Sequence, residues 1–563
     1  NSMSAAVVGQ PAKTIADQAG VNVPEGTKIL IAPLDKVGPD TPLSREKLSP
    51  ILGFYRAGTT DEAIDIADQL VHFGGMGHSA GIFSNNDEVI KQYSRRVKTS
   101  RILGNVPTSL GAIGDIYNRM DPSLTLGCGA YGGNSTSENV SVKNLLNIKR
   151  HSKRKVNMKW FKVPPKIYFE KGSLEYLRNI KGKRAFIVTD PTMARLGYVN
   201  KVVDYLKQAN MEVKIFSEVE PDPSTDTVTR GVEAMRRFEP DTIIAFGGGS
   251  PIDAAKGMWL FYENPDIRFE DLALRFADIR KRAVTFPSLG KKAILVAIPT
   301  TSGTGSEVTA FAVITDKANG IKYPLADYEL TPNIAIIDPE LTYSVPRSVT
   351  ADTGMDVLSH AVEAYVSVMA SDYTDALALQ SIRMLFKYLP IAYDEPTNEK
   401  AREKMHNASC MAGMAFTNAF LGINHSIAHK IGGQFHVPHG RANAILMKHV
   451  IRYNASTPSK YTAYPKYEYP VADKKYQEIA LALHLPAATP AEGVQSLIDA
   501  IDDLRAKLGI PASLKEYGID RDVFMKNLDD VALNAFDDQC TGANPRYPLV
   551  DELKDILIKA YEG

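Results

Sequence analysis

Histidines concentrate in one short stretch of the chain, beside other residue types that bind metal ions. Of the 11 histidines in 563 residues, four fall between positions 425 and 439: His425, His429, His436 and His439. Upstream, Asp356 and His360 are four residues apart, so on a helix both project from one face. Imidazole and carboxylate together suit a divalent ion such as iron or zinc. A lone buried histidine is usually only hydrogen-bonded, but this clustering predicts a metal site, and spacing leaves open which of these residues are ligands.

A glycine-rich loop could hold the phosphates of a dinucleotide. Gly247-Gly-Gly-Ser250 follows a predicted strand, and Pro251 comes where a first helical residue is expected. Glycines let the backbone approach an anion, and the free N–H groups at the start of a helix point toward it. Ser250 either caps this helix or donates to a phosphate oxygen. Alone, the motif is equally consistent with a plain tight turn, because short glycine runs are common.

A second loop of small polar residues strengthens the dinucleotide hypothesis. Pro299-Thr-Thr-Ser-Gly-Thr-Gly-Ser-Glu307 also follows a predicted strand, and its hydroxyls suit ribose, phosphate and carboxamide contacts, although an ordinary polar loop is the alternative. Two such loops at the carboxyl ends of parallel strands mark the ligand-binding edge of an open α/β sheet. Asp190 ends another predicted strand, at residues 184–190. Its carboxylate either accepts from a ribose 2′-OH, which favours NAD over NADP, or caps the next helix.

Residues 163–346 are predicted to form the domain that carries both loops. Short apolar runs predict strands at 184–190, 213–219, 241–246 and 293–298. Apolar positions at helical spacing predict two helices between the first three strands, at 198–208 and 228–238. This alternation is typical of a parallel sheet with helices on both faces.

The rest of the chain is predicted to form different structures on either side of this domain. Helical spacing at 356–369, 373–386, 401–420 and 491–507 predicts an all-helical domain over 347–563. Residues 1–142 mix a strand-like run at 28–32 with a helical pattern at 61–73, and they end in a glycine- and polar-rich tract. The segment 143–162, with its basic stretch, is predicted to be a solvated linker.

Composition argues against several classes of protein. The 65 basic residues balance 65 acidic ones, so no net field attracts nucleic acid or an anionic membrane. No uninterrupted apolar run is long enough to span a bilayer. Three widely spaced cysteines cannot build a disulfide framework and favour a reducing compartment, so a cytoplasmic location is expected.

Several separated motifs resemble those of the iron-containing alcohol dehydrogenase family. They are Gly247-Gly-Gly-Ser-Pro-Ile-Asp-Ala-Ala-Lys256, residues 299–309, Gly354-Met-Asp-Val-Leu-Ser-His360, His425-Ser-Ile-Ala-His429, Pro438-His439-Gly440 and Asn544-Pro-Arg546. The resemblance runs from about residue 163 to the end. It implies an α/β parallel-sheet dinucleotide-binding domain followed by an all-helical metal-binding domain. It also implies hydride transfer between NAD(H) and short-chain aldehydes and primary alcohols, such as acetaldehyde and ethanol, with Fe(II) as the usual metal and zinc in some relatives.

The resemblance also implies roles for particular residues. The family's metal ligands fall on Asp356, His360, His425 and His439. His429 matches a histidine near the substrate and is the candidate for the proton path, with a purely structural role as the alternative. The implied cofactor contacts are Asp190, Gly248, Gly249, Ser250, Asp253, Thr300, Thr301, Thr304, Thr309 and Lys322.

Motifs in the first 142 residues resemble the bifunctional aldehyde–alcohol dehydrogenases, which carry an acylating aldehyde dehydrogenase ahead of the alcohol dehydrogenase. The motifs are Gly74-Gly-Met-Gly-His78, Leu124-Thr-Leu-Gly-Cys128 and residues 132–139. This implies a partial α/β aldehyde dehydrogenase fold that lacks its dinucleotide fold and nucleophile and is expected to be inactive. Cys128 is expected to be structural, and His78 a remnant of that active site. Members of this family form helical filaments, so a homodimer with a tendency to polymerise is expected.

Two alternative functions compete with the dehydrogenase. A lyase on the same scaffold, of the dehydroquinate synthase kind, also binds metal and NAD, but it needs a basic pocket, and the segment 411–420 is too apolar for that. A filament-forming assembly module is the other alternative.

Overall fold

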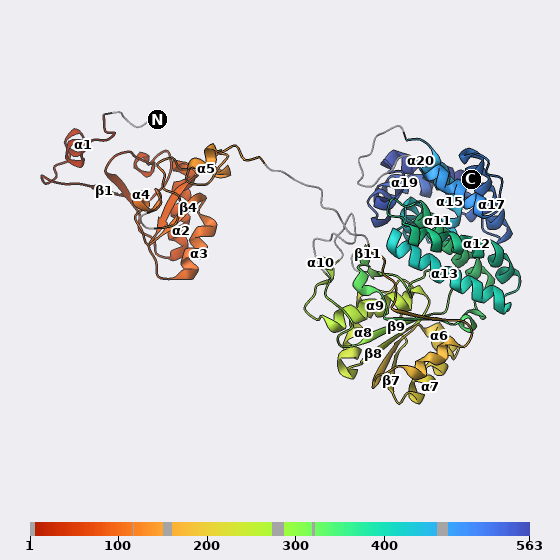
Figure 1. Cartoon of the computed structure of the whole chain (residues 1–563). Helices are drawn as coiled ribbons and strands as arrows, with labels where there is room; N and C mark the ends of the chain where they lie inside the picture. The colour runs from red at the N-terminus through yellow and green to blue at the C-terminus, as the bar shows by residue number, and fades with distance from the viewer. Residues whose placement is uncertain (1–5, 116–117, 150–159, 273–285, 318–320, 459–470) are drawn as a thin grey trace. The chain divides into compact units, whose positions relative to one another are not determined.

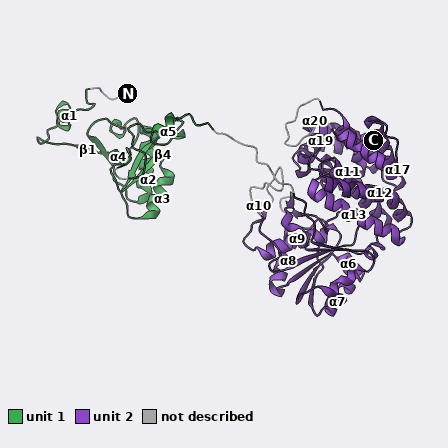
Figure 2. Ribbon diagram, viewed as in Figure 1, with its two compact units in different colours: residues 1–157 green, residues 158–563 purple. Residues whose placement is uncertain are grey.

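The computed structural model describes residues 6–115, 118–149, 160–272, 286–317, 321–458 and 471–563. The chain divides into two compact units, residues 1–157 and residues 158–563 (Figure 2). Each unit is described by itself below.

The first unit contains two small parallel sheets with helices beside them. Its main elements are β1 (Leu30–Pro33), β2 (Ile51–Phe54), α2 (Thr60–Gly74), β3 (Gly77–Ile82), α3 (Asp87–Arg96) and β4 (Thr99–Gly104). Strand β1 pairs with β2, and β3 pairs with β4. Both main helices begin at side-chain caps, because Thr59 and Asn86 accept from backbone N–H groups of the first turn. The buried apolar clusters are small, and the larger one consists of Ile64, Ala80, Tyr93 and Val97.

The second unit begins with a six-stranded sheet in which every pairing is parallel. The strands are β5 (Lys166–Phe169), β6 (Arg184–Val188), β7 (Glu212–Phe216), β8 (Thr242–Gly247), β9 (Ile294–Pro299) and β12 (Ile334–Ile337). Their order across the sheet is β5-β12-β9-β8-β6-β7. Because β6 has its successor β7 on one side and β8 on the other, the strand order reverses between β6 and β8. A reversal of this kind opens a crevice at the carboxyl ends of the two strands.

Helices cover both faces of this sheet (Figure 1). They include α7 (Tyr198–Gln208), α8 (Thr225–Phe238) and α9 (Gly249–Glu263). Alternate residues of β6 separate into two cores, since Ala185 and Ile187 pack with α7, whereas Phe186 and Val188 pack with α8 and α9. The predicted parallel sheet with helices on both faces is therefore confirmed. A hairpin of β10 (Phe311–Asp316) and β11 (Ile321–Ala326) follows β9.

The start of α9 differs from the sequence-based expectation. Pro251 is the third residue of the helix instead of the first, and Gly248 is the N-cap. A proline is tolerated there because the first four N–H groups of a helix have no intrahelical partner. No side chain caps α9, so of the two roles weighed for Ser250 the structure does not show helix capping, and phosphate binding stays a prediction.

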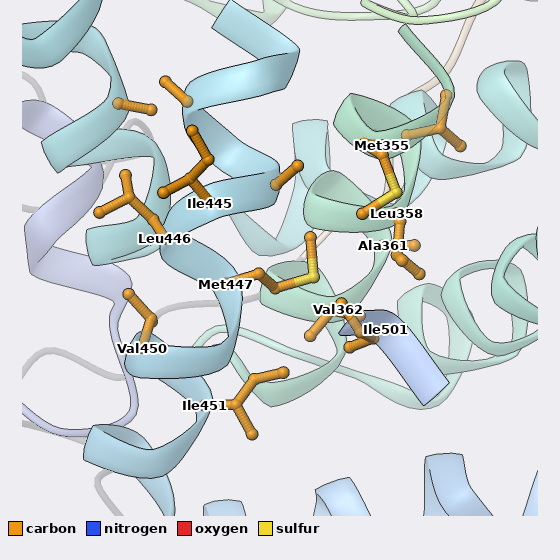
Figure 3. Close-up of a cluster of buried hydrophobic side chains, with 14 of the residues drawn as sticks. Met355, Leu358, Ala361, Val362, Ile445, Leu446, Met447, Val450, Ile451 and Ile501 are labelled. Carbon is orange, nitrogen blue, oxygen red and sulfur yellow. The ribbon is translucent and has the colours of Figure 1, made fainter. Parts of the chain in front are cut away.

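After residue 346 the described chain is helical, as predicted. The main helices are α11 (Arg347–Val366), α12 (Asp372–Asp394), α13 (Glu399–Ala419), α14 (Ile423–Phe435), α15 (His439–Ala455), α16 (Ala472–Ala482), α17 (Pro490–Lys507), α19 (Arg521–Phe536) and α20 (Val550–Glu562). One continuous apolar cluster joins them. Figure 3 shows part of it, in which Leu358 and Val362 of α11 lie near Met447 of α15 and Ile501 of α17. This core holds α11 and α15 in fixed positions relative to each other.

Among the described residues, no helix combines the length and the apolar character needed to cross a membrane.

Candidate active site

Three of the predicted metal ligands converge from three helices. Asp356 lies on α11, His425 on α14, and His439 is the first residue of α15. Asp356 Oδ1 lies 3.5 Å from Nε2 of His425 and 3.4 Å from Nε2 of His439. Ligand atoms bonded tetrahedrally at 2.0–2.2 Å from a zinc-sized ion are about 3.4 Å apart. The two distances from Asp356 therefore fit a divalent ion of this size, and the three donor atoms all lie within 4.8 Å of one another.

A glycine brings His439 to this position. An added Cβ on Gly440 would lie 1.8 Å from the carbonyl oxygen of Asp352 on α11, which no side chain permits. The absence of a side chain thus lets the first turn of α15 contact α11 directly. Asp356 lies one turn after Asp352 on α11 and therefore faces His439.

His360 lies beside the three converging ligands. Its ring stacks between those of Phe416 and His425, with centroids 4.4 and 4.6 Å away. Its Nδ1 lies 4.0 Å from Asp356 Oδ2, and this buried nitrogen has no hydrogen-bond partner among the described residues. His360 is not among the three residues whose donor atoms lie within 4.8 Å of one another, so its role as a fourth ligand stays a prediction. His436, a candidate from spacing, is exposed at the end of α14 and does not join the group.

The electrostatics of the site favour a cation. Burial raises the pKa of the Asp356 carboxyl, but the imidazoles of His360 and His439 outweigh burial and hold this pKa well below its usual range. Burial lowers the pKa of His360 to about 3. Burial also lowers the pKa of His425, but the carboxylates of Glu363 and Asp356 outweigh it and raise the pKa to about 9. A buried ionised carboxylate with imidazoles around it is a suitable donor set for a divalent ion.

Residues that sequence reasoning missed hold the ligands in place. Nδ1 of His425 donates to Oε2 of Glu363 across 2.5 Å, which orients the ring with Nε2 toward Asp356. The Asn443 amide donates to Asp356 Oδ1 across 2.9 Å and lies 3.2 Å from Nε2 of both His425 and His439. Its own oxygen accepts from Asn424, which fixes the direction of the amide. Glu363 and Asn443 lie seven residues after Asp356 and four after His439, so helical spacing could have indicated both.

His429 lies next to the ligands on α14, one turn after His425. Its ring centroid is 5.3 Å from that of His439 and 6.0 Å from that of His425. The side chain is 35% exposed, whereas that of His425 is 1% exposed. His429 is therefore accessible to a ligand from outside, and its Nδ1 bonds Asp538.

The two predicted cofactor loops lie side by side at the carboxyl ends of β8 and β9, and β8 borders the reversal point of the sheet. Strands β8 and β9 pair at Gly247 and Pro299, and Thr300 N–H donates to the carbonyl of Gly247. An added Cβ on Gly248 would lie 3.6 Å from Thr301 Oγ1, and one on Gly249 would lie 2.9 Å from Thr304 Cγ2. Because no side chain caps α9, its first N–H groups remain available to an anion. This arrangement fits the pyrophosphate of a dinucleotide.

Asp190 lies at the same edge and has a definite structural role. Its Oδ1 accepts from the N–H groups of Thr192 and Met193 and so caps α6 (Pro191–Arg195). Its Oδ2 is 3.1 Å from an added Cβ on Gly247, so the carboxylate also borders the glycine loop. The two roles weighed from the sequence are therefore compatible with each other.

Three other predicted cofactor contacts are used within the protein. Asp253 Oδ2 accepts from Val313 N–H, and the buried Lys256 donates to both oxygens of Thr309. Thr300 and Thr309 are each 2% exposed. These residues join the two loops to β10, and their contact with a cofactor stays a prediction. Lys322 lies on β11, and its side chain is outside the described part of the structure.

Comparisons with known proteins agree with this arrangement. Residues 164–339 match the family model described as iron-containing alcohol dehydrogenase, and residues 350–561 match that of the C-terminal region of the Fe-containing alcohol dehydrogenase family. An NADPH-dependent butanol dehydrogenase of Clostridium saccharobutylicum is 49% identical over 404 residues, which cover 72% of this chain and 98% of that protein. The chain belongs to the iron-containing alcohol dehydrogenase family. It is therefore an oxidoreductase, and the lyase and assembly-module alternatives are not favoured.

Solved structures of this family resemble the second unit. An iron-containing alcohol dehydrogenase of Thermococcus thioreducens has a TM-score of 0.64 and 33% identity, and the match covers 72% of this chain and all of that one. A sulfoacetaldehyde reductase of Bifidobacterium kashiwanohense, in complex with NAD+, has a TM-score of 0.61 and 28% identity over 72% of this chain and 99% of that one. The predicted fold class, an α/β dinucleotide-binding domain before a helical domain, is confirmed.

Some relatives match the first unit of the chain as well as the second. An aldehyde-alcohol dehydrogenase of Streptococcus pneumoniae is 54% identical over 564 residues, a match that includes all of this chain. The chain spans 64% of the length of that relative.

Proposed function

We propose that the second unit interconverts short-chain primary alcohols and aldehydes, such as ethanol and acetaldehyde, with NAD(H) as the hydride carrier and Fe(II) as the metal. The observation that carries this proposal is the convergence of donor atoms from Asp356, His425 and His439 within 4.8 Å of one another. A family relative whose NAD+ complex is known supports the cofactor. Zinc has the same ligand preferences and remains compatible with the site.

The chain's own residues would divide the work as follows. Asp356, His360, His425 and His439 would hold the ion, which when bound supplies Lewis acidity toward the substrate oxygen. The loops at 247–250 and 299–304 would hold the dinucleotide. Oxidation moves a hydride from the alcohol carbon to C4 of the nicotinamide and releases the hydroxyl proton, giving aldehyde, NADH and H+. His429, exposed beside the ligands, would receive that proton and pass it to water.

Asp190 supports NAD over NADP as the cofactor. A carboxylate beside the glycine loop can accept from a ribose 2′-OH and repels a 2′-phosphate. Since the butanol dehydrogenase relative is NADPH-dependent, the preference requires a direct measurement. We expect Asp190→Gly to raise kcat/KM with NADP by about 10-fold or more, equivalent to about 1.4 kcal/mol of removed repulsion. A variant that still rejects NADP would place the discrimination elsewhere.

For the first unit we propose a partial acylating aldehyde dehydrogenase domain without activity of its own. Its agreement with the aldehyde-alcohol dehydrogenase of Streptococcus pneumoniae supports this proposal. The backbone N–H of Cys128 donates to Oδ1 of Asn134, which suits a structural residue. We further propose a cytoplasmic homodimer that can extend into helical filaments, to be examined by native mass measurement and negative-stain electron microscopy.

A single assay tests the central proposal. Purified protein, loaded with Fe(II) under argon, should reduce NAD when ethanol is added and oxidise NADH when acetaldehyde is added. The same protein treated with a chelator is the control and should lose both activities. Loaded protein that transfers no hydride in either direction would overturn the proposal.

A further inference from the structure

Asp538 connects His429 to a distant part of the chain. It is the N-cap of η7 (Gln539–Ala543), where its Oδ1 accepts from Cys540 N–H across 3.0 Å. Its Oδ2 faces α14, at 3.2 Å from Nδ1 of His429 and 2.7 Å from Nζ of Lys430. The Asp538 side chain is only 9% exposed. One nearly buried carboxylate thus contacts two neighbouring residues of the helix that carries the metal ligand His425.

These contacts determine how His429 is presented. A carboxylate can only accept, so Nδ1 of His429 carries the hydrogen in this bond. Nε2, on the other side of the ring, then keeps its lone pair and is the atom offered to a ligand. The ring also stacks on that of His439, with an interplanar angle of 12°, which restricts its rotation. The tautomer and the orientation of His429 are therefore both set by neighbouring residues.

We propose that Asp538 is the positioning residue for His429. It holds the imidazole in one tautomer and one orientation, with Nε2 toward the substrate position. Asp538 does not itself touch the reacting atoms. This inference rests on the proposed alcohol dehydrogenase function and on the role of His429 in it.

Two other roles for Asp538 lead to different predictions. A purely structural carboxylate would serve to cap η7 and pair Lys430, and its loss would reduce stability alone. Alternatively, His429, Asp538 and Cys540 offer donor atoms within 4.8 Å of one another, as in a second metal site. The Lys430 ammonium, 2.7 Å from the shared oxygen, opposes a second cation there. The structure therefore favours the positioning role.

A double-mutant cycle on the iron-loaded full chain tests the proposal. Asp538→Asn keeps the shape of the side chain and an oxygen for the η7 cap, but it removes the charge. We expect kcat for ethanol oxidation to fall by about 10- to 100-fold, as for outer residues that orient a histidine, with KM nearly unchanged. In the His429→Ala background the same substitution should change kcat by less than about 2-fold, because coupled residues are non-additive.

Lys430→Met is the matched control, since it removes the other partner of the same oxygen. It should keep kcat within about 3-fold of the wild type, because the contact between Asp538 and His429 stays in place. Iron content and melting temperature are measured for every variant. Asp538 would be purely structural if Asp538→Asn lowered only the melting temperature, or if it lowered kcat equally with and without His429. A second metal equivalent that binds the wild type but not Asp538→Asn would instead support the second metal site.

The outcomes also separate this inference from the proposed function. If the wild type oxidises no ethanol, the proposed function fails first. If His429→Ala is as active as the wild type, the role of His429 fails and the positioning role of Asp538 fails with it. If His429→Ala is impaired but Asp538→Asn is not, only the inference about Asp538 is overturned.

Discussion

The two units differ in how completely they bury their apolar side chains. In the first unit, Ile31, Leu52 and Phe54 on the paired strands β1 and β2 are 63, 51 and 47% exposed. In the second unit, Phe186 and Ile187 on β6 are fully buried, one on each face of the sheet. A well-packed core holds side chains in single rotamers, and metal ligands must be fixed within fractions of an ångström. The clustered donor groups accordingly belong to the unit with the extensive core.

The largest expected effect is on catalysis, and it is tested by substituting one histidine of each unit by alanine. His425→Ala removes a buried, proposed metal ligand and should lower kcat/KM for ethanol by at least about 1,000-fold, since metal catalysis contributes several kcal/mol. His78→Ala, at an exposed position of the first unit, should leave this activity unchanged. Steady-state assays and iron analysis of both variants check the pair. Equal losses would show that the chemistry depends on both units.

The next largest effect is on stability and comes from removing a large apolar side chain in each unit. Phe186→Ala should destabilise the second unit by about 3–5 kcal/mol, because it opens a cavity beside Phe216. Phe54→Ala in the first unit should change stability by no more than about 0.5 kcal/mol. Both tryptophans, Trp160 and Trp259, belong to the second unit. Tryptophan fluorescence during urea unfolding therefore reports on that unit, and circular dichroism follows both. A large loss for Phe54→Ala would mean that the exposed strands pack more tightly than described.

The smallest effect is a pH dependence. Burial raises the pKa of Glu220, but hydrogen bonds from Thr227 and Ser224 outweigh burial and lower the pKa to about 2, from an ordinary value of 4.5. A lowered folded-state pKa contributes stability above pH 4.5, and this contribution is lost as the pH falls from 4.5 toward 2. The free energy of unfolding, followed by tryptophan fluorescence, should therefore fall more steeply over this range for the wild type than for Glu220→Gln. Asp121→Asn in the first unit, at a carboxylate that is 40% exposed, should leave the acid transition of the second unit, as followed by tryptophan fluorescence, unchanged.

Regular patterns made parts of the fold predictable. The helix expected at 198–208 has the same bounds as α7, and its apolar residues Val199, Val202 and Leu206 are buried. The boundaries were less accurate where a cap or full burial decided them. Helix α8 begins at Thr225 because Ser224 caps it, three residues before the apolar pattern starts. Helix α11 begins at Arg347, and from Gly354 to Val366 it is buried on all sides, so its pattern lacks the one-sided period that predicts a surface helix.

The candidate site was predictable to the extent that it is local in sequence. Clustered histidines indicated the metal, and the assignment of four ligands depended on the family resemblance. Asp538 could not be linked to His429 from the sequence, because 109 residues separate them. Such a pair forms only when α14 and the segment after α19 meet in the folded core. The carboxylates and amides that orient the ligands likewise acquire their roles from tertiary structure.

The placement of the ligands on separate helices gives the ion a mechanical role. An ion held by Asp356, His425 and His439 ties α11, α14 and α15 together, much as a covalent cross-link closes loops in a chain. Any ligand that binds only the folded form adds to its stability, by about 2.7 kcal/mol at a hundredfold excess over Kd. Iron supply would then govern the lifetime of the protein as well as its turnover.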